Sequence, residues 1–234
     1  MRLFPFLASL SGVDGSRILG GGNVRAAVLG ANDGLVSNFS LVMGVVGGTG
    51  NPDFVILAGV AGLLAGAFSM AAGEYVSMRS QLDIYEHAID KKRIDLQERP
   101  DEAKERLALI YQAKLLSPDE SLNIAERVML NPKVVLDTMV REDLGIGPVQ
   151  VGSPWGASIS SFVFFIAGAS VPIIPYLFDA GDLMFWMSSV FSGGALCIVG
   201  AVIALLSGRN VFWGAARMFI AGVAAATGTF GVGK

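Results

Sequence analysis

The stretch GLLAGAFSMAAGEYVSMRSQLDIYE, residues 62–86, passes from apolar and small residues into charged residues without a helix breaker. No Gly or Pro occurs between Glu74 and Arg99, so we expect one helix to continue from the apolar part to about Gln97. The apolar part has the length of a membrane span, which needs ~20 residues. The stretch therefore predicts a span that continues out of the bilayer as a solvated helix.

The composition of the whole chain is that of a membrane protein. Of its 234 residues, 53% are hydrophobic and 16% are charged, against ~25% charged residues in soluble domains. The formal net charge is −3 and no basic block is present, which argues against a nucleic-acid partner. The one cysteine, Cys197, can form no internal disulfide and is expected to be a buried small hydrophobe.

Five segments are apolar and long enough to cross a bilayer, so the predicted fold is an all-α membrane protein with five transmembrane helices. They cover residues 24–47, 54–76, 155–178, 183–206 and 211–232. Short connections make the neighbouring spans antiparallel. Pro172 and Pro175 should kink the third span and release backbone carbonyls.

The polar insert at residues 79–147 is a solvated domain of three helices between the second and third spans. It holds 11 of the 17 Lys and Arg residues and 14 of the 20 Asp and Glu residues. Pro100 opens its first helix, and Pro132 opens the last. The middle helix carries a capping signature, with Ser117 at the N-cap and Glu120 three residues later.

The domain organisation and the orientation follow from these segments. The predicted parts are an N-terminal arm at 1–23, spans one and two at 24–78, the insert at 79–147, and spans three to five at 148–234. Lys and Arg lie mainly before span one and in the insert, which places the N-terminus and the insert in the cytosol. The C-terminus is then extracytosolic. This pattern fits a multi-pass protein of a prokaryotic cell membrane, although a vacuolar membrane has the same sidedness.

Two carboxylates, Asp33 and Glu74, fall inside predicted spans, where an acid costs ~2.5–3.5 kcal/mol on insertion scales. Met70 and Met78 flank Glu74 at helical spacing, and Asn38 follows Asp33 on span one. Carboxylate oxygen and thioether sulfur suit a borderline divalent metal such as Fe²⁺. These residues are therefore candidates for a metal site inside the spans. The alternative is that the acids are wet at the interface and the methionines are ordinary core.

Acidic stripes on the insert helices could collect cations from the cytosol. Those stripes include Glu86 on the extended second helix, then Glu98, Glu102 and Glu105, and finally Met139, Glu142 and Asp143. The alternative is a set of solvated faces whose acids pair with neighbouring Lys and Arg residues.

Two long stretches resemble the vacuolar iron transporter family, which has bacterial-type members. They are RAAVLGANDGLVSNFSLVMGV at 25–45 and the opening stretch at 62–86. The resemblance implies a homodimer of five-span subunits that exports Fe²⁺, and sometimes Mn²⁺, from the cytosol in exchange for protons. By position, the motif's aspartate, methionine and glutamate fall on Asp33, Met70 and Glu74. With Asn38 and Met78 beside them, these residues are the transport pathway that the resemblance predicts.

The same resemblance implies that the insert is a metal-binding domain with mainly glutamate ligands. Glu102 and Glu105 match a Glu-x-x-Glu pair, and Met139 with Glu142 match late ligands; Glu86, Glu98 and Asp143 are further candidates. The chain departs from the family pattern after Glu105, where no second Glu-x-x-Glu pair follows. This departure predicts fewer ligands in the insert than the family pattern implies.

The predicted function is proton-coupled export of Fe²⁺ or Mn²⁺ for iron homeostasis, without enzymatic activity and without a prosthetic group. The metal is the substrate and H⁺ the counter-ion. The alternative is a membrane-anchored metal sensor or buffer that transports nothing. A metalloenzyme is disfavoured because the chain has no HExxH and only one histidine.

Overall fold

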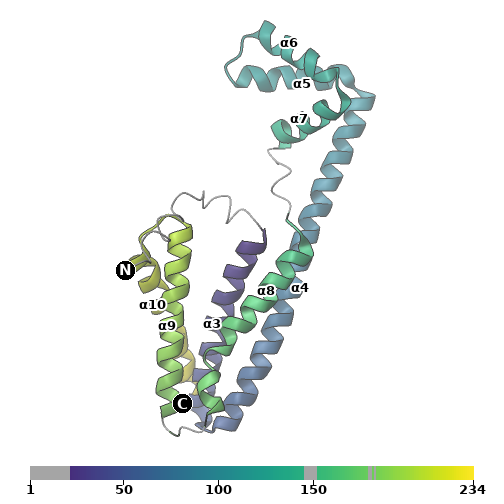
Figure 1. Cartoon of the computed structure of the whole chain (residues 1–234). Helices are drawn as coiled ribbons and strands as arrows, with labels where there is room; N and C mark the ends of the chain where they lie inside the picture. The colour runs from purple at the N-terminus through teal and green to yellow at the C-terminus, as the bar shows by residue number, and fades with distance from the viewer. Residues whose placement is uncertain (1–21, 145–151, 179–180, 182) are drawn as a thin grey trace, which may run out of the picture. The chain divides into compact units, whose positions relative to one another are not determined.

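The computed structural model describes residues 22–144, 152–178, 181 and 183–234, without the side chains of Lys133, Asp143 and Leu144. This part of the chain contains helices and no strand. The helices are α3 (Gly22–Thr49), α4 (Pro52–Glu98), α5 (Pro100–Ala113), α6 (Pro118–Met129), α7 (Pro132–Leu144), α8 (Pro154–Ser170), the 3₁₀ helix η2 (Ile174–Leu177), α9 (Leu183–Leu206) and α10 (Val211–Gly233). Figure 1 shows their order along the chain. All but two residues of the predicted N-terminal arm at 1–23 lie outside the described residues.

The chain divides into two compact units. One is formed by Met1–Met78 together with Gly152–Lys234, and the other by Arg79–Val151. Helix α4 contributes to both, because it continues for 47 residues without interruption. The absence of Gly and Pro after Glu74 predicted this continuation, and the helix ends one residue beyond the expected Gln97.

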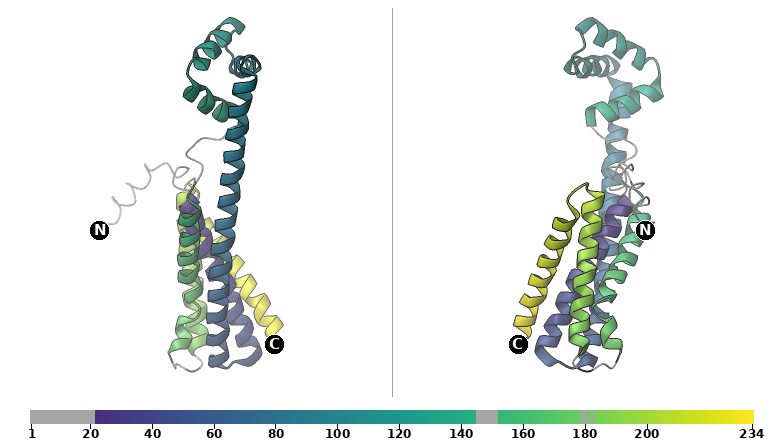
Figure 2. Two further views of the ribbon diagram at one scale, coloured as in Figure 1. Left: turned by 90° about the vertical axis from the view of Figure 1, so that its right-hand side faces the viewer. Right: turned by 60° about the vertical axis from the view of Figure 1, so that its left-hand side comes forward.

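In the first unit, α3 lies at the centre of a helical bundle and packs against α8, α9 and α10. Figure 2 shows these helices side by side, with α3, α8 and α10 starting at the same end of the bundle. The core includes Leu35 and Val42 of α3, Leu196 of α9 and Tyr176 of η2. Neighbouring helices along the chain are antiparallel, as the short connections predicted.

Gly34 permits the close approach of α3 and α8. A Cβ at this position would meet the carbonyl oxygen of Phe165 and would lie 3.1 Å from the backbone nitrogen of Ala169. Two helix backbones can come this close only where one contributes a residue without a side chain. The glycine therefore fixes the position of the α3 segment that carries Asp33 and Asn38.

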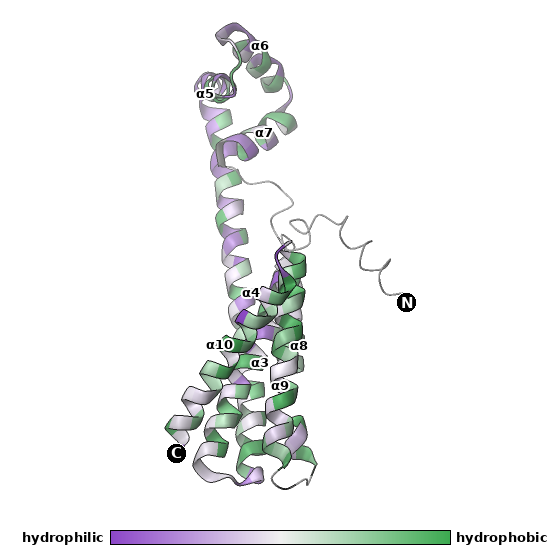
Figure 3. Ribbon diagram, turned by 90° about the vertical axis from the view of Figure 1, so that its left-hand side faces the viewer, coloured by the Kyte–Doolittle hydropathy of each residue, from purple (hydrophilic) through white to green (hydrophobic). Residues whose placement is uncertain are grey.

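Among the described residues, three helices are long and apolar enough to cross a membrane: α4, α9 and α10. Helix α8 is apolar but shorter, at 17 residues. Helix α3 has 28 residues, but its polar side chains lower its hydropathy. Figure 3 shows mainly hydrophobic residues along the helices of the first unit and a mixture of hydrophilic and hydrophobic residues along α5, α6 and α7. The count of five spans stays a prediction.

The prediction of one kinked helix over residues 155–178 was wrong. Helix α8 ends at Ser170, and the chain continues through a turn into η2. Pro172 and Pro175 lie in this region, where their rings and missing N–H groups prevent a regular helix. One released carbonyl is satisfied, because the Ser188 hydroxyl donates a hydrogen bond to the Pro172 oxygen at 2.8 Å.

In the second unit, α5, α6 and α7 pack around a small core that includes Leu107, Ala125 and Met139. Helix α6 begins with the predicted capping box. The Ser117 hydroxyl accepts a hydrogen bond from the Glu120 N–H at 3.4 Å, and the Glu120 carboxylate accepts one from the Ser117 N–H at 3.0 Å. These bonds satisfy backbone donors that a helix start leaves open.

Replacing Ser117 with alanine should destabilise α6 by ~1 kcal/mol at neutral pH, the usual cost of an N-cap serine. Amide hydrogen exchange in α6 should then be about fivefold faster than in the unchanged protein. Hydrogen bonds from the side chain and backbone of Ser117 hold the pKa of Glu120 below its ordinary value. Because the pKa of Glu120 is lower in the folded state, its ionised form stabilises the folded state when the pH is above the unfolded-state pKa. This contribution is lost as the pH falls through the folded-state pKa. Equal exchange rates in both proteins at neutral pH would contradict the capping role.

Candidate functional site

A cavity of about 350 Å³ lies between α3, α4 and α8 in the first unit. It is lined by Asp33, Ser37, Asn38 and Leu41 from α3, by Gly62, Gly66, Ser69 and Met70 from α4, and by Phe165 from α8. Three of the predicted pathway residues, Asp33, Asn38 and Met70, therefore line one cavity. Asp33 and Asn38 of α3 contribute oxygen atoms to the cavity, and Met70 of α4 contributes a sulfur atom.

Asn38 presents an unpartnered oxygen at this cavity. Its side chain is 2% exposed, and its amide nitrogen donates a hydrogen bond to the carbonyl of Ala169 at 2.7 Å. A carbonyl can only accept, so this bond assigns the nitrogen and leaves Oδ1 on the other side. Among the described residues Oδ1 has no partner. Gly62 leaves space for it, because a Cβ there would lie 2.9 Å from Oδ1.

The Asp33 carboxylate lies on the exposed side of α3 at the edge of the cavity. The Ser37 hydroxyl donates to the backbone carbonyl of Asp33, one turn earlier in the helix, and not to its carboxylate. Within the described part of the chain no ion pair involves Asp33. Both carboxylate oxygens are therefore available to a cation.

Glu74 is bound by Arg25 instead of lining the cavity. The Arg25 Nη2 and Glu74 Oε1 atoms are 2.6 Å apart, and the Glu74 side chain is 12% exposed. Arg25 belongs to the first turn of α3, and Glu74 lies one turn beyond Met70 on α4. The ion pair compensates this largely buried carboxylate for the loss of contact with water. A cation that binds Glu74 must therefore compete with the guanidinium.

Met78 does not lie at the cavity. It is 3% exposed and packs against Ala26 and Ala157, so it is part of the core at this position. Met70, Glu74 and Met78 do not point in one direction, because four residues turn an α-helix by ~400°. Each side chain is therefore rotated about the helix axis by ~40° relative to the one before it. This packing gives no support to the predicted place of Met78 in the transport pathway.

Two predicted ligands of the second unit, Glu102 and Met139, line a small cavity of about 180 Å³. Asp95 and the three cations Lys92, Arg99 and Arg106 line it as well. Basic side chains outnumber carboxylates there, which disfavours a divalent cation in this arrangement.

Several predicted insert ligands are paired with basic side chains. Glu102 lies 3.6 Å from Arg99, Glu86 lies 3.5 Å from Arg79, and Glu142 forms an ion pair with Lys114. Glu98 and Glu105 are exposed, and the Asp143 side chain is outside the described residues. Within the described residues no three His, Cys, Asp or Glu side chains form a group that could hold a metal ion. The predicted insert site is therefore not assembled in this arrangement.

Sequence reasoning missed three features of the first unit's site. Arg25 was interpreted as a marker of orientation, and Ser69 and Phe165 received no role. The positions of Gly62, Gly66 and Ser69 carried a usable signal, because a spacing of four and then three residues places them on one face of α4. Small residues on one face indicate a neighbouring helix or a cavity.

The sequence matches a family model and several curated proteins. The model of the VIT family matches residues 24–234. A vacuolar iron transporter of Acanthamoeba castellanii is 36% identical over 217 residues, covering 91% of this chain and 78% of the relative. Vacuolar iron transporter 2 of Oryza sativa subsp. japonica is 28% identical over 212 residues, covering 90% and 86%. A vacuolar iron transporter of Centaurea cyanus is 26% identical over 215 residues, covering 92% and 88%. Because the family model covers nearly the whole chain, this protein belongs to the VIT family.

Proposed function

We propose that this protein exports Fe²⁺ or Mn²⁺ from the cytosol in exchange for protons, as a secondary transporter and not as an enzyme. The observation that carries the proposal is the cavity lined by Asp33, Asn38 and Met70 in the apolar unit. The names of the relatives, which describe iron transporters, support the choice of iron as the substrate.

The donor atoms at the cavity suit a borderline divalent metal. Asp33 supplies carboxylate oxygens, Asn38 an amide oxygen without a partner, and Met70 a thioether sulfur. Mg²⁺ and Ca²⁺ prefer oxygen ligands alone, so the sulfur favours a softer ion such as Fe²⁺. The metal is a substrate, so it must dissociate from the cavity after transport. An incomplete set of ligands allows this dissociation.

Exchange with protons follows from the use of one carboxylate for both ions. A carboxylate must be deprotonated to bind a metal, so metal binding and protonation exclude each other at Asp33. Glu74 offers a second position, where the arriving cation displaces Arg25. No separate proton site is needed for the coupling.

A homodimer is part of the proposal, because a single subunit leaves Asp33 exposed. An intramembrane carboxylate that faces lipid is costly, whereas one that faces a second subunit or an aqueous path is not. Large apolar side chains on α4 are also uncovered, and they include Phe54, Leu57, Leu64 and Phe68, between 46% and 67% exposed. A second copy would cover part of this surface and close the cavity.

We also propose that the N-terminus and the insert are cytosolic, that five helices span a prokaryotic cell membrane, and that the insert collects metal ions for transport. Lys and Arg placement supports this orientation. The ion pairs of Glu86, Glu102 and Glu142 favour a more modest role for the insert than the sequence suggested. The second candidate function is the membrane-anchored metal sensor or buffer. It would be favoured only if the first unit transports no metal.

The test is metal transport by the purified full-length protein in sealed liposomes. One dye inside the vesicles reports Fe²⁺ or Mn²⁺, and another reports pH. We expect metal flux that a pH gradient accelerates, together with proton flux in the opposite direction. Metal flux without proton movement would contradict the exchange mechanism. Binding of metal without any flux would favour the sensor or buffer.

Glu74→Gln should lower the transport rate by about tenfold or more, because it removes a carboxylate from the pathway while keeping its size. The double variant Arg25→Glu with Glu74→Arg is the matched control, since it restores an ion pair with the charges exchanged. We expect this control to fold and to transport poorly, because the carboxylate is displaced. Full activity of the exchanged pair would show that Glu74 has only a structural role.

A further inference from the structure

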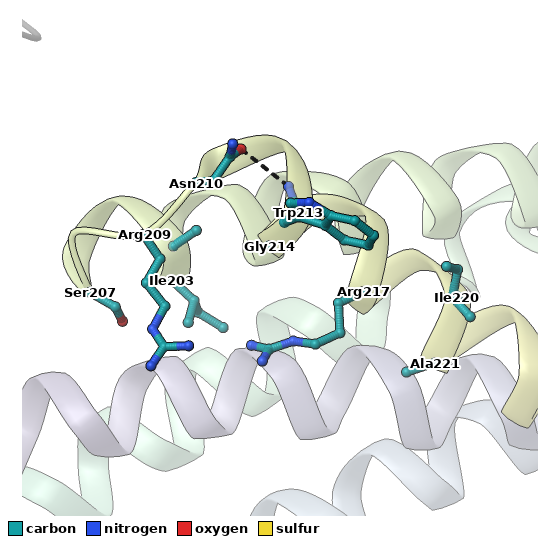
Figure 4. A pocket seen from close by; sticks show the side chains of 10 residues that line it. Ile203, Ser207, Arg209, Asn210, Trp213, Gly214, Arg217, Ile220 and Ala221 are labelled. Atoms are coloured by element: carbon teal, nitrogen blue, oxygen red, sulfur yellow. Dashed lines mark hydrogen bonds between the residues drawn. The ribbon is translucent and has the colours of Figure 1, made fainter.

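Two arginines of the first unit converge on a cavity that the proposed transport path does not use. The cavity has a volume of about 760 Å³ and lies at the connection between α9 and α10. Arg209 is in the connection itself, and Arg217 is nearly two turns into α10. Figure 4 shows the two side chains on the same side of α10, with their guanidinium groups turned toward one another.

Neither guanidinium has an acidic partner among the described residues. Two like charges that face each other repel, and both side chains are exposed in the described structure, so an anion can reach them. The other lining residues are mostly apolar or uncharged, such as Ile203, Trp213 and Ile220. An anion between the two arginines would remove the repulsion and satisfy both.

The start of α10 is not itself the binding group. The Asn210 side chain already accepts hydrogen bonds from the N–H groups of Phe212 and Trp213, at 2.9 and 3.4 Å. Figure 4 shows Asn210 and its bond on the side of the helix away from the two guanidiniums. Recognition of the anion therefore depends on Arg209 and Arg217.

We infer that Arg209 and Arg217 bind the phosphate of an anionic phospholipid headgroup. Guanidinium groups bind phosphate oxygens in pairs, with a geometry that an ammonium does not offer. The depth of the site favours a lipid over a free anion. Arg217 lies ~9 Å along α10, at ~1.5 Å per residue. Its long side chain reaches back toward the helix start (Figure 4), as it would at a membrane interface. Trp213, beside them, is of the residue type enriched at that interface.

The test compares lipid binding to the full-length protein in detergent by native mass spectrometry. The probes are phosphatidylglycerol, phosphatidylcholine and inorganic phosphate. We expect the unchanged protein to prefer phosphatidylglycerol, and the double variant Arg209→Gln with Arg217→Gln to bind it about tenfold more weakly. Lys234→Gln is the matched control, because it removes one positive charge at the opposite end of α10, and it should bind phosphatidylglycerol unchanged.

A second variant guards against loss of folding. Arg209→Lys with Arg217→Lys keeps both charges but loses the paired geometry, so its affinity should lie between those of the unchanged protein and the glutamine variant. Unchanged phosphatidylglycerol binding in the glutamine variant would overturn the inference. Equal affinity for phosphatidylcholine, or for inorganic phosphate at the same concentration, would overturn it as well. A change in oligomeric mass with lipid binding unchanged would assign the arginines to a subunit contact instead.

Discussion

Replacing Asp33 with asparagine is expected to abolish metal transport while the protein remains folded. The variant keeps the size of the side chain and removes its charge, so a metal ion at the cavity loses its only carboxylate there. The transport rate should fall by at least about 100-fold, because even groups that only orient metal ligands contribute roughly 10–100-fold to affinity or activity. Flux into liposomes gives the rate directly.

Folding of the Asp33→Asn variant is expected because the carboxylate is exposed and, within the described structure, makes no ion pair. Asp53→Asn is the matched control. Asp53 is an exposed carboxylate of the same unit in the first turn of α4, and it does not line the cavity. The control should transport at the normal rate. Normal transport by Asp33→Asn would remove the central residue of the proposed pathway.

Gly34→Leu is expected to cause the largest loss of stability. Its side chain would have to enter the space occupied by the backbone of Phe165 and Ala169, so α3 and α8 would be forced apart. Overpacking usually costs ~1–3 kcal/mol, and a backbone neighbour, which cannot rotate away, places this site at or above the upper value. Thermal unfolding of the purified protein in detergent measures the loss, and transport should fall with it because Asn38 moves away from Ala169.

Gly73→Leu is the control for Gly34→Leu. Gly73 is also inside an apolar helical segment, but a Cβ there would meet nothing within 4 Å. Removing a helical glycine at such a position should raise stability by up to ~1 kcal/mol through helix propensity alone. If both variants unfold at the same temperature, the contact between α3 and α8 does not depend on Gly34.

The helix boundaries of the second unit were predictable because their signals are local. Pro100 and Pro132 begin helices α5 and α7, and Ser117 with Glu120 forms the capping box before α6. Each signal depends on one or two neighbouring residues. The end of α8 was predicted wrongly, because Pro172 can either kink a helix or end it. The choice depends on distant partners such as Ser188, which no local pattern reveals.

The predictability of the candidate site follows the same division. Asp33, Asn38 and Met70 were conspicuous as polar or sulfur-containing residues in apolar segments, and all three line the cavity. The partner of Glu74 was not predictable, since Arg25 is 49 residues away and its contact arises only when α3 and α4 pack. In the insert, the acidic stripes and local partners such as Arg99 for Glu102 were visible, but the pairing of Glu142 with the distant Lys114 was not.

The ion pair between Arg25 and Glu74 bears on the number of protons carried for each metal ion. In the proposed exchange, the metal-free site must have its negative charges neutralised before it can face the cytosol again. Arg25 already neutralises Glu74, so only Asp33 requires a proton on the return. One proton would then be exchanged for one divalent ion, so every cycle would move one net positive charge out of the cytosol. Since moving one charge through 100 mV changes the free energy by ~2.3 kcal/mol, a membrane voltage that is negative on the cytosolic side would oppose this export, and the pH gradient would have to overcome it.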